Sequence, residues 1–264
     1  MRSRRPFAFC AGIACADALA RMPARVGDWA VEPICSTWDD TEVCCLVASS
    51  DPDADDLGSV AHPDHPRSRA FSELGDPHGA LGVWPAAYAA TTALAARAAI
   101  FRGGPPRVLE LGCGAGLPSL YASVVLESPR VLATDVEDVP LEFLEAARAA
   151  HGPPAPGSFA TALLDVSDSD ALALIGDFDV VVAADLLYDA DVAASLGGLL
   201  GRAVANGGLA AIVADPGRRG RDAFLDAFIA ASGSPAAFVD AETRGAFDVF
   251  DGTPQASVGV LEVG

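Results

Sequence analysis

The chain of 264 residues contains no lysine, because all 17 of its basic residues are arginine. This absence excludes every mechanism in which a lysine of the protein itself acts, such as a P-loop lysine on a nucleotide phosphate, a Schiff base or a lysine general base. A coding bias toward alanine, glycine, arginine and proline explains the composition most simply.

Positive charge as a whole is scarce, since 36 acidic residues accompany 17 basic ones and the formal net charge is −19. Binding to nucleic acid depends mainly on neutralised phosphates, so no nucleic acid is expected as a partner. A basic protein or peptide suits this charge better. Hydrophobic residues make up 51% of the chain, which excludes disorder throughout and fits one globular domain with an appendage.

Long apolar runs and paired cysteine motifs are also missing. No stretch of about 18 apolar residues is free of charge, so we predict no membrane-spanning helix and no membrane partner. The 6 cysteines include no CxxC pair and no zinc spacing with histidine, so we predict an intracellular protein with reduced thiols and no metal site. His62 and His65 lie among prolines and acids, which is typical of a solvated loop.

The N-terminus is compatible with two interpretations. Its first residues, MRSRRPFAFCAGIACADALA, combine an arginine cluster typical of an organellar presequence with an alanine-rich stretch that faintly resembles a secretory signal. Asp17 interrupts the apolar core of such a signal. An ordinary cytoplasmic N-terminus and a targeting peptide for a mitochondrion or plastid are therefore both retained.

Two regions differ in composition. Residues 1–80 form an N-terminal extension in which 29–34 and 42–47 read as a β-hairpin, and 49–80 read as a long loop rich in Asp, Pro, Ser, Gly and His. From its position, we expect the extension to shape a substrate entrance. The main domain is predicted to cover 81–264.

Within the main domain, apolar runs alternate with alanine-rich helical stretches. Runs such as 180–184 suit strands that are buried on both faces, which requires an α/β fold with a mainly parallel sheet and helices on each side. We predict strands over 107–111, 130–134, 159–165, 179–186 and 208–214, with a final strand pair over 236–239 and 257–263. We predict helices over 85–101, 117–127, 138–150, 190–205 and 220–232.

A glycine-rich turn follows the first of these strands. Residues 107–118 read RVLELGCGAGLP, so a buried strand enters a turn with alternate glycines and a helix leaves it. Glycine lets the backbone bend sharply and approach a ligand closely. Because Leu117 stands where the fingerprint GxGxxG needs its last glycine, a nicotinamide or flavin cofactor is less favoured.

An acid, Asp135, ends the next strand. A carboxylate at the carboxyl end of the neighbouring parallel strand can hold both hydroxyls of a ribose. Since the glycine turn lacks a phosphate-binding pattern, we predict a nucleoside ligand without a pyrophosphate. S-adenosylmethionine (SAM) fits that description.

The segment from about residue 82 to the C-terminus resembles the seven-strand class I methyltransferases, which have a Rossmann-like sheet. In detail it is similar to the methyltransferase-like protein-lysine methyltransferase group. Besides the glycine turn, the resemblance rests on GVWPAA at 82–87 and on FDVVVAADLLY at 178–188, which ends in an Asp-x-x-Tyr motif. The DPGR sequence at 215–218 resembles a loop of the branch that acts on a mitochondrial electron-transfer flavoprotein subunit.

The resemblance implies SAM as the cofactor and assigns residues to its binding. The family commonly has a tryptophan near the adenine, where this chain has Val166. The implied contacts are Trp84 lining the pocket, Glu110 near the methionine amino group, Gly112, Cys113 and Gly114 near the methionine part, Asp135 on the ribose, Ala184 beside the cofactor and Val166 near the adenine.

The predicted catalytic residues are Asp185 and Tyr188, which follow a strand's carboxyl end. We predict that Asp185 accepts a hydrogen bond from an incoming amine and that Tyr188 presents its ring and hydroxyl to the same site. The structural alternatives are a helix N-cap for Asp185 and a core aromatic for Tyr188. The arginines over 218–221 are predicted to be solvated, with contact to an acidic patch of a substrate as the alternative.

Methylation of a lysine side chain on a protein substrate is therefore the predicted function, with the oligomeric state open. Two alternatives are a methyltransferase that acts on a small amine or on histidine, and a noncatalytic scaffold of the same fold. Entry of methyl label into protein or into a small molecule separates the enzymatic alternatives.

Overall fold

The computed structural model describes residues 15–27, 29–38, 40–48, 82–155, 158–168, 171–207, 209–240 and 258–263. Residues 1–14, the greater part of the stretch that is compatible with a targeting peptide, lie outside these ranges. The predicted loop over 49–80 and its two histidines lie outside them as well. Among the described residues, no helix is long and apolar enough to cross a membrane.

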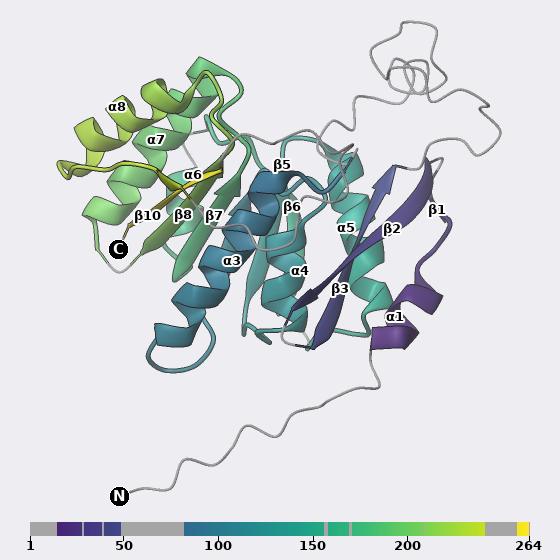
Figure 1. Cartoon of the computed structure of the whole chain (residues 1–264). Coiled ribbons are helices and arrows are strands. Elements are labelled where there is room, and N and C mark those ends of the chain that lie inside the picture. The colour runs from purple at the N-terminus through teal and green to yellow at the C-terminus, as the bar shows by residue number, and fades with distance from the viewer. Residues whose placement is uncertain are drawn as a thin grey trace, which may run out of the picture.

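Seven strands form the central sheet. They are β4 (Val108–Leu111), β5 (Val131–Asp135), β6 (Phe159–Leu163), β7 (Val180–Ala184), β8 (Ala210–Asp215), β9 (Val239–Asp240) and β10 (Gly259–Val263). Their order is β6-β5-β4-β7-β8-β10-β9 (Figure 1). β4 to β8 pair in parallel, whereas β10 is antiparallel to both of its neighbours. The predicted α/β fold with a seven-strand sheet is confirmed.

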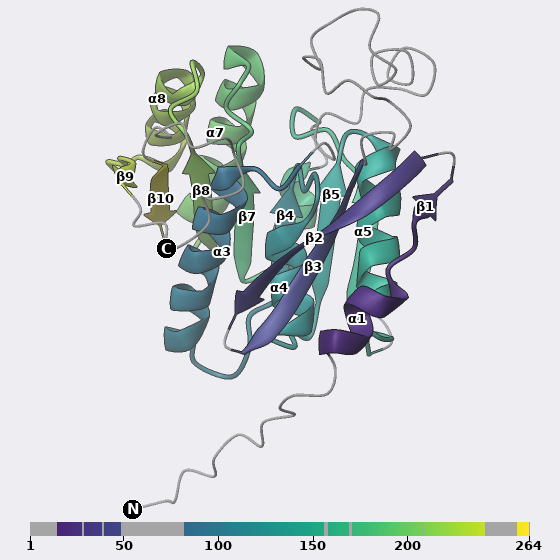
Figure 2. The same cartoon turned by 45° about the vertical axis from the view of Figure 1, so that its right-hand side comes forward.

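Helices cover both faces of this sheet (Figures 1 and 2). One face carries α3 (Pro85–Ile100), α4 (Leu117–Val124) and α5 (Asp138–Ala150), and the other carries α6 (Ala171–Ile175), α7 (Ala190–Ala205) and α8 (Arg221–Ser232). Successive residues of β7 enter opposite cores: Val180 and Val182 pack on the α3 side, and Val181 and Ala183 on the α7 side. This alternation explains the continuous apolar run, because each face of a covered parallel strand needs apolar side chains.

A second, smaller sheet lies outside α4 and α5. It consists of β1 (Arg25–Val26), β2 (Trp29–Trp38) and β3 (Thr41–Ala48), all antiparallel, and a short helix α1 (Cys15–Arg21) precedes it. β3 packs on both α4 and α5, as Figure 2 shows. The predicted hairpin is confirmed, with longer strands and one additional strand. This small sheet covers the faces of α4 and α5 that point away from the main sheet.

The cysteines of this small sheet differ from the prediction of reduced thiols. Cys35 and Cys44 form a disulfide, whereas Cys45 and Cys113 are buried thiols. The prediction is wrong for the bonded pair because the antiparallel register places Cys35 directly opposite Cys44, with their Cα atoms 4.0 Å apart. A spacing of nine residues in sequence gives no sign of this pairing.

The other predicted elements are confirmed with small shifts in their bounds, except that β9 begins at Val239 and shares only that residue with the predicted strand over 236–239. β6 ends at Leu163, two residues before the predicted end, because Asp165 begins a turn by accepting a hydrogen bond from the Ser167 N–H at 2.8 Å. The short elements α1, β1 and α6 were not predicted, since two to seven residues carry too little periodicity.

The strand order reverses between β4 and β7, since the chain continues from β4 to β5 on one side and enters β7 on the other. Open α/β sheets bind ligands outside the carboxyl ends of their strands at such a point. We call the end of the sheet near residues 111, 135, 163, 184 and 215 the carboxyl edge, and the opposite end the amino edge.

Candidate active site

The glycine turn joins β4 to α4 at the carboxyl edge. Gly112, Gly114 and Gly116 all have positive φ, at 61°, 49° and 71°, a region that glycine enters at little cost. A Cβ at Gly112 would overlap the side chain of Leu186, which follows β7. The predicted need for glycine is therefore confirmed for the bend. The close approach of this backbone to a ligand stays a prediction.

Asp135 connects the end of β5 to this turn. Its carboxylate accepts hydrogen bonds from the Gly114 N–H at 2.9 Å and from the Glu137 N–H at 3.2 Å. Burial raises the pKa of Asp135, and the backbone hydrogen bonds oppose that shift. The structure thus brings together two predicted cofactor-binding residues that are far apart in sequence.

Glu110, the third residue of β4, lies beneath the turn and is only 1% exposed. Its Oε2 accepts hydrogen bonds from the Ser119 N–H at 2.9 Å and the Ser119 hydroxyl at 2.5 Å. The carboxyl group therefore satisfies one of the free N–H groups in the first turn of α4. Burial raises the pKa of Glu110 to about 8, so its protonated form predominates at neutral pH.

Cys113 lies between Gly112 and Gly114 in the turn, and its side chain is buried. Burial raises the pKa of its thiol far above the usual range, and the neighbouring carboxyl groups of Glu110 and Asp135 add to the shift. The side chain is therefore a neutral thiol at physiological pH. Its backbone N–H donates to the Thr134 carbonyl at 2.8 Å, which ties the glycine turn to β5.

The loop after β7 holds the two predicted catalytic residues. Asp185 has a φ of 61°, uncommon for a residue with a side chain, and its N–H donates to the Ala214 carbonyl of β8 at 2.9 Å. Asp189, not Asp185, caps α7 by accepting hydrogen bonds from the N–H groups of residues 191 and 192. The N-cap alternative for Asp185 is therefore wrong.

Tyr188 is 52% exposed, so the alternative of a core aromatic is wrong as well. Burial of part of its ring raises the pKa of its hydroxyl, and acids from three strand ends add to the shift. These acids are Asp135 at the end of β5, Asp165 after β6, and Asp189 and Asp185 after β7. The hydroxyl therefore stays protonated at neutral pH.

The arginines over 218–221 are not simply solvated, which corrects that prediction. Arg218 forms two hydrogen bonds with the Asp185 carboxylate, from Nε to Oδ1 at 2.6 Å and from Nη2 to Oδ2 at 2.9 Å. Arg221 donates from Nε to the buried carboxylate of Asp215 at 2.7 Å. Acids at the ends of two adjacent strands attract these side chains, and sequence distance hides that arrangement.

The remaining predicted cofactor residues lie around the same edge. Trp84 is half-buried and immediately precedes α3, where its carbonyl accepts a hydrogen bond from the Ala87 N–H at 2.9 Å. Ala184 is the last residue of β7. Val166 lies in the turn after β6 and packs against the core on the α7 side. Their contacts with a cofactor stay predictions.

The sequence does not predict the contacts of three residues in this region. Ser119 binds Glu110, Leu186 packs over Gly112, and Arg218 binds Asp185. Only Arg218 belongs to a recognisable sequence motif, since it ends the DPGR sequence at 215–218. Contacts across strand ends depend on the strand order, which the sequence does not state.

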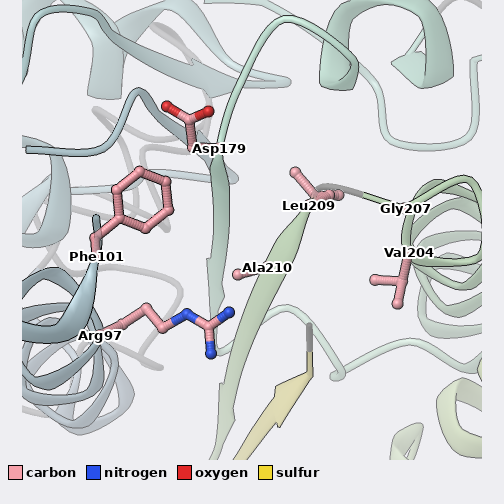
Figure 3. Close-up of a pocket in the computed structure, with 7 residues that line it drawn as sticks. All are labelled: Arg97, Phe101, Asp179, Val204, Gly207, Leu209 and Ala210. Atoms are coloured by element: carbon pink, nitrogen blue, oxygen red, sulfur yellow. The ribbon is translucent and has the colours of Figure 1, made fainter. Parts of the chain in front are cut away.

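A cavity of about 380 Å³ lies at the other end of the sheet (Figure 3). It is bounded by the starts of β7 and β8 and by residues at the ends of α3 and α7. Its lining residues are Arg97, Phe101, Asp179, Val204, Gly207, Leu209 and Ala210. Because it lies at the amino edge, this cavity is separate from the glycine turn and from Asp185.

Comparison with known proteins identifies the family of the chain. The family profile described as "Lysine methyltransferase" matches residues 66–228. The chain belongs to the lysine methyltransferase family. A curated relative, the electron transfer flavoprotein beta subunit lysine methyltransferase of Xenopus laevis, is 32% identical to this chain over 148 residues. The match covers 54% of each protein, so the chain spans about half the length of this curated relative.

Solved structures that resemble this chain share less of its sequence than the curated relative does. The methyltransferase domain of bacterial CtHen1 is 14% identical with a TM-score of 0.48, and the match covers 66% of this chain and 96% of that one. The ribosomal protein L11 methylase of Lactobacillus delbrueckii subsp. bulgaricus is 20% identical with a TM-score of 0.47, and the match covers 66% and 76%. Similarity at this level gives no information on substrate.

Membership of this lysine methyltransferase family implies SAM as the cofactor. The hydrogen-bond acceptors at the glycine turn fit that molecule. Two buried carboxyl groups, on Glu110 and Asp135, lie beside a turn whose backbone carries little side-chain bulk. The oxygens of these carboxyl groups can accept hydrogen bonds from an amino group and from ribose hydroxyls, both of which SAM carries.

Proposed function

We propose that this chain is a SAM-dependent methyltransferase that acts on a lysine side chain of another protein. One observation supports this most directly. The glycine turn with its buried acids and the loop that contains Asp185 and Tyr188 lie on the two sides of the reversal in strand order, in a member of the lysine methyltransferase family. A cofactor and an acceptor can meet at this point of the sheet.

In this proposal, the turn after β4 and the end of β5 bind the cofactor. Glu110 accepts a hydrogen bond from the methionine amino group, and Asp135 accepts from the ribose hydroxyls. The backbone of the turn approaches the methionine part without side-chain interference. The residues that complete the pocket are Gly112, Cys113, Gly114, Trp84, Val166 and Ala184.

The loop after β7 receives the acceptor. When bound, SAM supplies an electrophilic methyl group on a sulfonium. A lysine side chain has an ordinary pKa of about 10.4, so it must lose a proton before its nitrogen can attack. Asp185 accepts a hydrogen bond from the incoming amine and fixes its direction, and Tyr188 presents its ring and hydroxyl to the cationic group. The nitrogen would gain the methyl carbon as the bond between that carbon and the sulfonium sulfur breaks, so the cofactor would leave as a neutral thioether and one nitrogen proton would pass to solvent.

The acceptor we propose to test first is electron transfer flavoprotein beta subunit, after the printed name of the Xenopus laevis relative. The charge of this chain supports a protein acceptor with a basic surface around the target lysine, since the formal net charge is −19.

The test is incubation of the purified chain with methyl-labelled SAM and either a cell extract or that flavoprotein subunit, followed by gel electrophoresis and mass spectrometry. We expect one labelled protein that carries methyl-lysine. Because the chain itself has no lysine, any methyl-lysine must come from another protein. Label only in small molecules or in histidine would contradict the proposed acceptor class, and SAM binding without any transfer would favour a scaffold.

A further inference from the structure

Two loops at the carboxyl edge are joined along their length. The β7 loop comprises residues 185–189 and the β8 loop comprises residues 215–220. The Gly220 N–H donates to the Leu187 carbonyl at 2.9 Å, and Arg219 Nε donates to the Tyr188 carbonyl at 2.7 Å. A Cβ at Gly220 would lie 2.7 Å from that Leu187 oxygen, which is too close. The β8 loop is therefore packed tightly enough to determine the position of the β7 loop.

Arg218 makes the most specific of these contacts. Its guanidinium binds both oxygens of Asp185, with one hydrogen bond to each, at 2.6 and 2.9 Å. The Asp185 side chain is only 7% exposed, whereas that of Arg218 is 40% exposed. A bidentate arginine fixes both the place and the plane of a carboxylate, which a point charge cannot do.

A buried acid in turn fixes Arg218. Asp215 is fully buried at the end of β8, and its carboxylate accepts hydrogen bonds from the N–H groups of Gly217 at 2.9 Å and Arg218 at 3.1 Å. Arg221 binds the same carboxylate at 2.7 Å and lies over the ring of Phe238. The backbone at Arg218 is thus held before its side chain reaches Asp185.

From this chain of contacts we infer that Arg218 is a positioning residue that orients the Asp185 carboxylate toward the incoming amine. The inference rests on the proposed function of Asp185. Each carboxylate oxygen has more than one acceptor site, so a hydrogen bond to Arg218 leaves capacity for the amine. The positive φ of Asp185 makes this support necessary, because a side-chain-bearing residue there is held by its surroundings.

The kinetic test compares the full-length wild-type chain with Arg218→Ala and Arg218→Lys, using methyl-labelled SAM and electron transfer flavoprotein beta subunit. We expect kcat to fall by on the order of tenfold to a hundredfold in Arg218→Ala, because a small misplacement of a reacting group has effects of this size. The affinity for SAM, measured by calorimetry, should stay unchanged. Arg218→Lys should recover only part of kcat, and added guanidinium ion should partly rescue Arg218→Ala.

The matched control is Arg107→Ala. Arg107 binds Asp179 with the same two-bond geometry, at 3.0 and 2.8 Å, but at the amino edge of the same strand. This variant should keep the wild-type kcat. An unchanged kcat in Arg218→Ala would overturn the inference, and so would a rise in the KM for the protein acceptor alone, which would indicate direct contact with the acceptor.

A double-mutant cycle keeps the inference separate from the proposed function. The urea midpoints of Arg218→Ala, Asp185→Asn and the double variant are compared with that of the wild type. If the wild-type chain transfers no methyl group, the proposed function fails, but the cycle still reports on the contact. We expect the two substitutions to be less than additive, since each removes the same interaction. Additive shifts would mean that Arg218 does not hold Asp185, which overturns the inference.

Discussion

The two edges of the parallel sheet hold acids in opposite environments. At the amino edge, Asp179 is partly exposed and pairs with Arg107, which holds the pKa of Asp179 below its usual range. At the carboxyl edge, Glu110 and Asp135 are buried, and burial raises the pKa of each. An ion pair at a strand end is therefore not in itself a sign of a functional site. Buried acids beside a glycine turn are costly to fold and point to a ligand.

The largest expected effect is on the rate of methyl transfer, and it should distinguish the two aspartates on either side of β7. Asp185→Asn should lower methyl transfer by about 100-fold, because a misplacement of the reacting nitrogen by about 1 Å can have an effect of this size. Asp179→Asn, at the start of β7, should leave transfer unchanged. Steady-state rates with labelled SAM and the protein acceptor measure both variants. Retained turnover in Asp185→Asn would remove this residue from the mechanism.

The next effect concerns cofactor affinity. Asp135→Ala should weaken SAM binding by about 3 kcal/mol, on the order of 100-fold, because it removes charge-assisted hydrogen bonds to the ribose hydroxyls. The control is Asp177→Ala at the amino edge, where the carboxylate is exposed and pairs with Arg130. Calorimetric titration gives both affinities. Equal affinities for Asp135→Ala and the wild type would contradict the ribose assignment.

A third expectation concerns the pH dependence of folding. Because the pKa of Glu110 rises from 4.5 to about 8 on folding, the folded state binds more protons than the unfolded state between these values. Stability from this group is present below pH 4.5 and is lost as the pH rises through 8. Glu110→Gln cannot ionise and still accepts a hydrogen bond from Ser119. We expect this variant to gain on the order of 3 kcal/mol over the wild type at pH 8 relative to pH 5 without ligand.

Urea unfolding at the two pH values measures that difference. A variant whose stability falls with pH as steeply as that of the wild type would show that Glu110 does not ionise within the fold.

The smallest effect belongs to the ion pair at the amino edge. Arg107→Ala should lower the free energy of unfolding by less than about 1 kcal/mol, since solvent weakens a partly exposed pair. The loss should disappear as the pH falls below the unfolded pKa of 3.8 for Asp179 and then through its lower folded value. Urea unfolding at pH 7 and pH 3 measures it. If Arg107→Ala also lowered the rate of methyl transfer, the amino edge would contribute to activity, which contradicts the difference between the two edges.

The sequence predicts the sheet well because its strands are buried on both faces. The continuous run at 180–184 and the alternation of strands with alanine-rich helices define a covered parallel sheet. The glycine turn is predicted equally well, because its three alternate glycines adopt positive φ angles that residues with a side chain rarely adopt. The placement of Asp135 beside this turn follows from the adjacency of successive parallel strands.

The contacts between loops could not be predicted in the same way. Arg218 and Asp185 lie 33 residues apart, and their meeting depends on β7 and β8 being neighbours. The disulfide between Cys35 and Cys44 depends likewise on the register of a hairpin. Sequence periodicity identifies which face of an element is buried, but it does not align the ends of elements that are distant in the chain.

The most direct test of the difference between the edges is hydrogen exchange of the full-length chain with and without SAM, followed by mass spectrometry. We expect SAM to protect backbone amides at 112–116, 135–137 and 184–188, all at the carboxyl edge, and to leave those at 97–101, 177–180 and 204–210 unchanged. Protection confined to the second set, around the cavity at the amino edge, would contradict the assignment of the carboxyl edge as the active site.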